Sequence, residues 1–323
     1  MDYTKREAKD AAKEAFRGIW GTVHTPMTPD GELDEAGLRT NIDKMITDWR
    51  LSGLLFNGAV GEFWALTREE QHRVIEIGVE ETRGRCKNIV MTTATSVQEC
   101  IALTRFAQEV GADFAAPFNP VFPAVAPEEG LARWWTQLAE SVDIGLWMID
   151  TGLAGANLSL KMTAEMAALP NIVGLKVQRG AEYYDAVRKA TGGALTISDA
   201  HEGSLLERVR QGQEVYMSAP AAVLMQRPGY TPMVDYFDAA RRGDWDEAQR
   251  TFDSMTPLRE LYETYLSAEK FKGTIAVAVV KPWSAHLGLA AGPVRPPLVE
   301  LSPAETQELL GRVDALSPQG SAA

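Results

Sequence analysis

A single lysine interrupts an otherwise apolar segment, Ile172-Val-Gly-Leu-Lys-Val177. The segment follows the turn residues Leu169-Pro-Asn171, and so short an apolar run is typical of a strand that is buried on both faces. Burial disfavours an ammonium group and lowers its pKa, and a neutral amine can form an imine with a carbonyl substrate. Lys176 could equally be a strand-end lysine that reaches solvent or forms a structural ion pair. The segment alone leaves both interpretations open.

A second group of candidates could bind an acid. Gly58-Ala-Val-Gly-Glu62 directly follows a short apolar run, and its glycines permit close approach to backbone N–H groups that could hold a carboxylate or phosphate. An ordinary tight turn is the alternative. Thr25, which precedes Pro26, could orient a proton relay, although Thr-Pro is also common in loops.

Three further residues could transfer protons. Asp150 ends the run Trp147-Met-Ile-Asp150, where an acid–base role and an N-cap or Asx-turn role are both compatible with the sequence. His201 and Glu202, in Ser198-Asp-Ala-His-Glu202, are candidates for general acid–base catalysis. They lack a third ligand at metal-like spacing, so we expect no metal site.

The elements that would position these residues repeat along the chain. Eight short apolar runs alternate with helical patterns: 18–24, 53–57, 88–92, 113–118, 144–149, 172–177, 195–198 and 214–219. Eight β-then-α units predict a (β/α)8 TIM barrel, in which reactive groups gather at the carboxyl ends of the strands. The first run is not followed by Gly-x-Gly-x-x-Gly, which argues against a dinucleotide-binding fold.

The pattern changes after Pro228, where helical patterns continue without strands. We therefore expect a barrel with a short N-terminal helix over residues 1–228, and a C-terminal helical extension packed on it over 229–323. Capping boxes at Thr67–Glu70, Ser96–Glu99 and Ser302–Glu305 predict helix starts, and the last of these helices should run to about Ala315. The small, polar tail from 317 to 323 is expected to be disordered.

Composition narrows the class of protein. A net charge of −12 and the absence of a basic run argue against a nucleic-acid or membrane partner. Two cysteines, Cys86 and Cys100, cannot build a disulfide framework, and the polar N-terminus has no signal-peptide pattern. We expect a cytoplasmic protein.

Over about residues 15 to 315, the chain resembles the dihydrodipicolinate synthase / N-acetylneuraminate lyase superfamily of class I pyruvate-type aldolases. The motifs that carry the resemblance are Thr25-Pro26, Gly58–Glu62, Leu66-Thr-x-Glu-Glu70, Gly174-Leu-Lys176 and Gly292-Pro-Val-Arg-x-Pro-Leu298.

The resemblance implies that Lys176 forms a Schiff base with a 2-oxo acid and that the loop of Gly58, Ala59, Val60 and Gly61 binds its carboxylate. Ser218 and Thr25 complete the substrate-binding residues that we expect. The resemblance also implies a homotetramer and no cofactor, because the imine itself is the electron sink.

The chain departs from the family pattern at two places. The family loop is usually Gly-Thr-Thr-Gly-Glu, and its second Thr relays protons, whereas Ala59 and Val60 have no hydroxyl. Strand five of the family usually ends in Tyr-Asn, and the Tyr is its general acid–base group. The best register places Ile149 and Asp150 at those positions.

These departures disfavour dihydrodipicolinate synthesis and sialic acid cleavage. The hydratase-aldolase branch, which cleaves ylidene-pyruvates to an aldehyde and pyruvate, is more similar: it resembles the chain at Val60, at His201-Glu202 and at the turn Gly243–Trp245. Our leading hypothesis is a Schiff-base lyase that makes or breaks a C–C bond next to a 2-oxo acid, with an aldehyde as second product or substrate. Two alternatives stay open: a dehydratase of a 2-keto-3-deoxy sugar acid, and a barrel without catalysis that binds a small acid.

Overall fold

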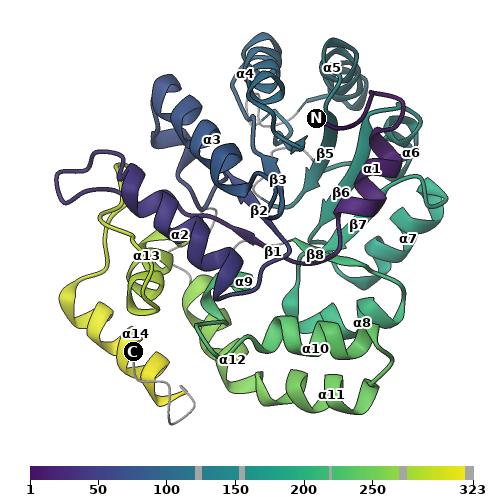
Figure 1. Ribbon diagram of the computed structural model, residues 1–323. Helices are drawn as coiled ribbons and strands as arrows, with labels where there is room; N and C mark the ends of the chain where they lie inside the picture. The colour runs from purple at the N-terminus through teal and green to yellow at the C-terminus, as the bar shows by residue number, and fades with distance from the viewer. Residues whose placement is uncertain (121–125, 153–156, 218–219, 269–274, 317–323) are drawn as a thin grey trace. The chain divides into compact units, whose positions relative to one another are not determined.

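The structure is a computed structural model that describes residues 1–120, 126–152, 157–217, 220–268 and 275–316. Within these ranges, eight strands alternate with helices (Figure 1). The strands are β1 (Gly18–Thr22), β2 (Gly53–Phe56), β3 (Lys87–Val90), β4 (Phe114–Ala115), β5 (Gly145–Asp150), β6 (Ile172–Val177), β7 (Thr196–Asp199) and β8 (Val215–Met217). Each overlaps one of the eight apolar runs. The fold is a (β/α)8 barrel with additional C-terminal helices, which confirms the predicted class.

Helices connect the strands and continue beyond the last one. They are α1 (Ala8–Ala15), α2 (Glu35–Thr47), α3 (Arg68–Thr82), α4 (Val97–Val110), α5 (Glu128–Ser141), α6 (Leu160–Ala167), α7 (Ala181–Thr191), α8 (Leu205–Arg210), α9 (Ala221–Leu224), α10 (Pro232–Arg241), α11 (Trp245–Ser254), α12 (Thr256–Leu266), α13 (Val277–His286) and α14 (Pro303–Ala315), with short 3-10 turns η1 (Phe63–Ala65) and η2 (Glu202–Ser204).

The predicted helix starts are present. The capping boxes at Thr67–Glu70 and Ser302–Glu305 form in both directions, and the Ser96 side chain accepts from the N–H of Glu99. Helix α14 ends at Ala315, as expected. The tail that we expect to be disordered lies outside the described residues.

The chain divides into two compact units, one formed by residues 1–17 and 82–217 and the other by 18–81 and 218–323. The first unit contains β3 to β8, with parallel pairing of each strand to the next from β3 to β7. The second contains β1 and β2, which pair in parallel, and helices α9 to α14. The boundary that we expected at residue 228 stays a prediction.

The indole of Trp147 is buried in the first unit, on the same face of the sheet as Lys176. Trp147 is paired with Gly174 on β6, and a Cβ on Gly174 would lie 2.2 Å from Cε2 of Trp147. Phe16, which follows α1, packs against the same indole with ring centroids 4.4 Å apart. In Figure 1, α1 lies beside β5 and β6. Glycine at 174 is therefore required for the ring to lie flat on the strand.

The second unit repeats this arrangement at its own strand pair. Trp20 on β1 is paired with Gly53 on β2, and a Cβ on Gly53 would lie 2.3 Å from the indole. Elsewhere in this unit, Val60 joins a fully buried apolar cluster built mainly by α12, α13 and α14. The other buried members of the cluster are Leu224, Leu261, Ala276, Val279, Val280, Trp283, Leu309 and Val313.

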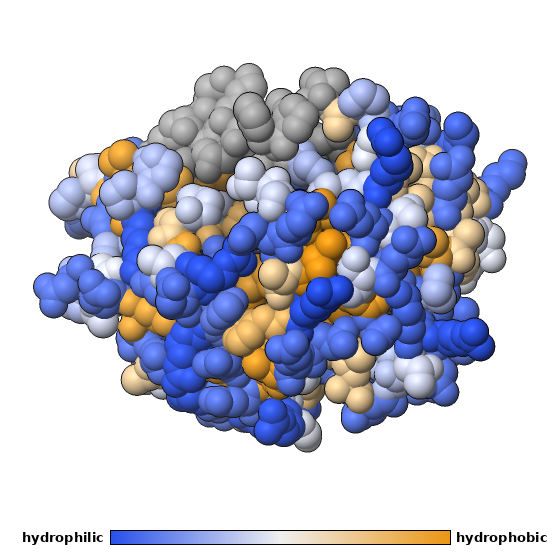
Figure 2. Space-filling model, turned by 90° about the horizontal axis from the view of Figure 1, so that it is seen from above, coloured by the Kyte–Doolittle hydropathy of each residue, from blue (hydrophilic) through white to orange (hydrophobic). Residues whose placement is uncertain are grey.

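Hydrophilic side chains predominate on the face drawn in Figure 2, with apolar residues in small areas between them. Among the described residues, no helix combines the length and the apolar character that a bilayer crossing requires.

Candidate active site

Lys176 is the half-buried residue of the otherwise buried strand β6. Burial lowers the pKa of its ammonium group to about 8. No carboxylate or hydroxyl among the described residues bonds to its Nζ, so no counter-ion opposes the effect of burial. This is the environment predicted for a nucleophilic amine rather than for a structural ion pair.

The strand register explains why Lys176 loses hydration. Ile149 on β5 and Ser198 on β7 are paired with Lys176, so all three side chains leave the sheet on one face. Gly174, two residues earlier on β6, belongs to the same face and is covered by Trp147. The amine thus projects above an indole and beside an isoleucine, which together keep water from its stem.

Ser198 is a candidate that the sequence reasoning did not single out. Its side chain is fully buried, and its Oγ accepts from the N–H of Met217 at 2.9 Å. No acceptor for the Ser198 hydroxyl proton lies among the described residues. A buried hydroxyl on the face of Lys176 can therefore still donate a hydrogen bond.

Asp150 lies on the other face of the sheet. It is paired with Val177, the residue after Lys176, and its side chain is fully buried. Its Oδ2 lies 3.1 Å from the Arg179 guanidinium, which stacks on Tyr183 with Cζ 3.8 Å from the ring centroid. These contacts support a structural role for Asp150, as the anion of a buried ion pair with Arg179. The alternative acid–base role of Asp150 stays a prediction.

His201 and Glu202 follow β7, where His201 is the N-cap of the turn η2 and Glu202 its first residue. His201 is exposed and Glu202 is buried. Asp199 orders this turn: its Oδ1 accepts from the N–H of His201 at 3.1 Å, and its Oδ2 lies 2.9 Å from Nε of the buried Arg208. The Ser204 hydroxyl donates to the same Oδ2. The structure thus fixes the backbone of both candidates, while their catalytic role stays a prediction.

The loop from Gly58 to Gly61 lies in the second unit and is buried. The N–H groups of Gly61 and Glu62 donate within the loop, to the carbonyls of Gly58 and Ala59. By contrast, the N–H groups of Gly58, Ala59 and Val60 have no acceptor among the described residues. Three consecutive buried donors without acceptors form a site that suits an anion.

Two side chains, those of Thr25 and Val60, hold this loop in place. Thr25 donates its hydroxyl to the Gly61 carbonyl at 2.8 Å, so the structure brings these two candidates together. Val60 points its side chain into the apolar cluster of the C-terminal helices. The residue that stands at the position of the family's second Thr is therefore a packing residue in this chain.

Glu62 links the loop to the Lys281 amine and to the backbone of Arg295. Its backbone is left-handed, with φ 56°, and its side chain is fully buried. Oε1 lies 2.6 Å from Nζ of Lys281 on α13, and Oε2 accepts from the backbone N–H of Arg295 at 2.8 Å. Burial lowers the pKa of Lys281, while the Glu62 carboxylate acts against that shift.

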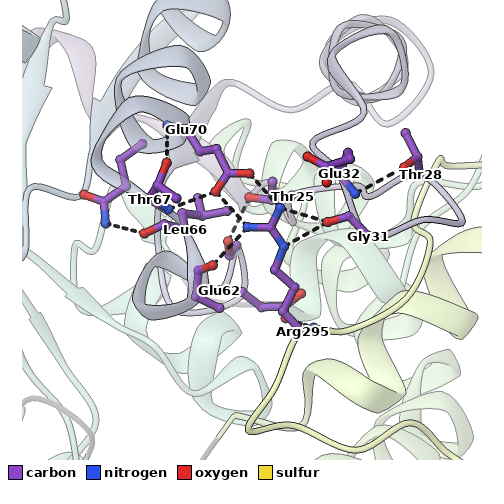
Figure 3. A network of polar contacts seen from close by, with 12 residues as sticks. Thr25, Thr28, Gly31, Glu32, Glu62, Leu66, Thr67, Glu70 and Arg295 are labelled. Atoms are coloured by element: carbon purple, nitrogen blue, oxygen red, sulfur yellow. Dashed lines mark hydrogen bonds and ion pairs between the residues drawn. The ribbon is translucent and has the colours of Figure 1, made fainter.

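The side chain of Arg295 continues this network (Figure 3). Its guanidinium binds both oxygens of Glu70, at 2.6 and 2.7 Å, and donates to the carbonyls of Gly31 and Ala65. Arg295 stands in the Gly292–Leu298 motif that carries part of the resemblance. The motif thus fastens the C-terminal segment to the start of α3.

Sequence reasoning missed Lys281, although the sequence pattern there is the same as at Lys176. A lone lysine follows the apolar residues Ala276-Val-Ala-Val-Val280. Ser218, which we expected in the substrate site, lies outside the described residues. Among those described, no group of three or more His, Cys, Asp and Glu side chains is arranged to hold a metal.

Comparison with known proteins shows the family of the chain. Residues 15–316 match the model of the dihydrodipicolinate synthetase family. The chain belongs to this family, whose members are carbon–carbon lyases, and it is accordingly an enzyme of that class.

Two curated relatives illustrate the range of activities. A 4-hydroxy-tetrahydrodipicolinate synthase of Methanoculleus marisnigri is 31% identical over 299 residues, which cover 91% of this chain and 97% of the relative. A Methylobacterium radiotolerans protein named "Probable 5-dehydro-4-deoxyglucarate dehydratase" is also 31% identical, over 305 residues that cover 93% and 95% of the two chains.

Solved structures show the same fold. YagE, a prophage protein of the family from E. coli K12 in complex with pyruvate, superposes with a TM-score of 0.81 at 25% identity, covering 93% of this chain and 98% of YagE. The chloride-inhibited dihydrodipicolinate synthase of Acinetobacter baumannii, complexed with pyruvate, gives 0.80 at 23% identity and covers 94% and 99%.

Proposed function

We propose that the chain is a Schiff-base lyase that makes or breaks a C–C bond next to a 2-oxo acid such as pyruvate. The observation that carries the proposal is the Lys176 amine, which is desolvated, has a pKa of about 8 and has no counter-ion among the described residues. The N–H groups of Gly58, Ala59 and Val60, which meet no acceptor in the described part of the chain, support an assignment to the substrate carboxylate. YagE, the relative complexed with pyruvate, supports the 2-oxo acid.

In the cleavage direction, the neutral Lys176 amine attacks C2 of the 2-oxo acid, and the C2 oxygen leaves as water after taking one proton from the amine and one from an acid, which gives an iminium ion. A base takes the proton of the C4 hydroxyl as the C3–C4 bond breaks, the electron pair of that bond passes to the nitrogen, and an aldehyde departs. The resulting enamine takes a proton at C3, and water hydrolyses the imine to release pyruvate and the free amine. Ile149 cannot transfer the proton, so we assign this role to His201-Glu202 or to a bound water.

Borohydride reduction in the presence of pyruvate tests the proposal. We expect one reduced pyruvyl group on the peptide that contains Lys176, and none in a Lys176→Met variant. Lys189→Met is the matched control, because Lys189 is an exposed lysine on α7 and its loss should leave the adduct unchanged. An unmodified wild-type protein would refute the Schiff-base scheme.

A dehydratase of a 2-keto-3-deoxy sugar acid is a second candidate, supported by the Methylobacterium relative named as a dehydratase. The same imine would serve both reactions. A panel of ylidene-pyruvates and keto-deoxy sugar acids distinguishes the two, because the aldolase route releases an aldehyde and the dehydratase route does not. Binding of these acids with no turnover would instead favour a barrel that has lost catalysis.

We also propose a homotetramer, on the family resemblance, and a reducing, cytoplasmic setting, with which the low number of cysteines (Cys86 and Cys100) agrees. Light scattering coupled to size exclusion gives the mass of the assembly directly. A monomeric or dimeric mass would exclude the tetramer.

A further inference from the structure

We infer that Lys281 is a positioning residue, which acts through Glu62 to hold the Gly58–Gly61 loop in the shape that receives the substrate carboxylate. The identity of the ligand rests on the proposed function. The contacts that carry the inference all lie within the second unit and stand without it.

Glu62 and Lys281 form a buried ion pair. The side chain of Glu62 is fully buried and that of Lys281 is 2% exposed, and their charged atoms lie 2.6 Å apart. The Lys281 amine also donates to the Pro293 carbonyl at 2.6 Å, which fixes its direction. Because a buried carboxylate that loses its partner is strongly destabilised, Lys281 determines where the Glu62 side chain can lie.

The backbone conformation at both ends of the loop is the second feature that matters. Glu62 adopts a left-handed conformation, which is unfavourable for a non-glycine residue. Its N–H donates to the Ala59 carbonyl at 3.1 Å, and its own carbonyl accepts from Ala65 at 2.7 Å. Asn57, at the other end of the loop, is also left-handed, with φ 54°. The orientation of the free N–H groups between these two residues therefore depends on the side-chain contacts that hold Glu62 in place.

Helix α13 is the element that anchors the loop. Val60 belongs to the same apolar cluster as Val279, Val280 and Trp283, the residues of α13 that surround Lys281 in sequence. Helix α13 thus holds the loop twice, by an apolar contact at Val60 and by the ion pair at Glu62. Both contacts therefore constrain the position of the loop.

The test uses Lys281→Met in the full chain, with two measurements. Hydrogen exchange reports the loop itself: we expect amide exchange in residues 57–62 to rise at least about tenfold, with residues 172–177 unchanged. Borohydride trapping reports the ligand: the pyruvate concentration for half-maximal adduct should rise at least about tenfold. For the neutral carboxamide of pyruvate, the concentration for half-maximal adduct should change by less than about threefold. The carboxamide lacks the negative charge that the N–H groups of the loop would bind.

Lys44→Met is the matched control, since Lys44 donates to the Gly288 carbonyl at 2.6 Å and does not touch the loop. It should alter neither measurement. If Lys281→Met fails to fold, the double variant Lys281→Met/Glu62→Gln removes both buried charges, and it should still lose discrimination between pyruvate and the carboxamide.

Two results would overturn the inference. One is unchanged amide exchange in the loop, and the other is an equal rise in the half-maximal concentrations of pyruvate and its carboxamide. A wild-type chain that traps no pyruvate would refute the proposed function instead, and the exchange measurement would still decide whether Lys281 positions the loop.

Discussion

Ile149 and Lys176 are paired in register on β5 and β6, so the amine has a hydrocarbon as its neighbour on that strand. The side chain of Ile149 is 4% exposed. The family that the chain resembles usually carries a tyrosine at the corresponding strand end. Ile149 has no group that could relay a proton, and its hydrocarbon side chain adds to the burial that lowers the pKa of Lys176.

A carboxylate at position 149 should therefore raise the pKa of Lys176. In Ile149→Glu, we expect the pH midpoint of imine formation to rise by at least about one pH unit and the rate at pH 7 to fall, because an adjacent anion stabilises the ammonium form. Ile149→Gln has the same length without the charge and is the control. Equal midpoints in the two variants would show that Ile149 does not govern the amine.

The rate of imine formation should follow the deprotonation of Lys176. Its pKa is lowered to about 8, so the neutral fraction, and with it the rate of pyruvate trapping, should rise from pH 6 to 8 and level off above pH 9. The measurement is the initial rate of borohydride-trapped adduct across this range. A midpoint near the ordinary lysine value of 10.5 would contradict the desolvated environment.

Removal of the amine should stabilise the fold. The folded-state pKa lies below the unfolded one, so the unfolded chain binds more protons between about pH 8 and 10.5, and stability rises with pH in that window. Lys176→Met should therefore increase the free energy of unfolding at pH 7 by about 1 to 3 kcal/mol. The gain should shrink towards zero by pH 10.5. Urea unfolding of both proteins at pH 7 and pH 10 checks this, and a gain independent of pH would argue against it.

Asp150 and Arg179 should matter for stability more than for chemistry. Arg179→Met leaves the buried carboxylate without its cation, and we expect a loss of about 3 kcal/mol in the free energy of unfolding. Asp150→Asn should slow pyruvate trapping far less than the ~100-fold typical of a lost acid–base group. A larger loss of activity in a variant that remains folded would restore Asp150 as the proton-transfer group.

Gly174 should not tolerate a methyl group. The added Cβ would overlap the Trp147 indole at 2.2 Å, and we expect Gly174→Ala to destabilise the protein by about 2 kcal/mol. A Cβ on Gly130, in α5, would meet no atom within 4 Å beyond the backbone of its own helix, so Gly130→Ala should stabilise the helix by up to about 1 kcal/mol. Thermal unfolding of the two variants should shift in opposite directions.

Local signals in the sequence were sufficient for the strands and for the desolvated environment of Lys176. The apolar runs predict all eight strands because each is buried, and the caps at Thr67 and Ser302 depend on residues only three positions apart. The site depends on longer distances along the chain. Glu62 meets Lys281 across more than 200 residues, and a lysine within an apolar run does not reveal which carboxylate it pairs with.

Orientation was the other quantity that the sequence left open. Asp150 ends β5 as predicted, yet alternation along the strand turns it away from the face of Lys176 and towards Arg179. Val60 could have been a lining residue of the loop, and only the packing of α13 shows that its side chain belongs to a core.

The two indole–glycine pairs share one dependence. Trp20 faces Gly53 and Trp147 faces Gly174, each across a pair of neighbouring parallel strands. A Cβ at either glycine would overlap the indole opposite, so each ring keeps its place only while the neighbouring strand carries no side chain there.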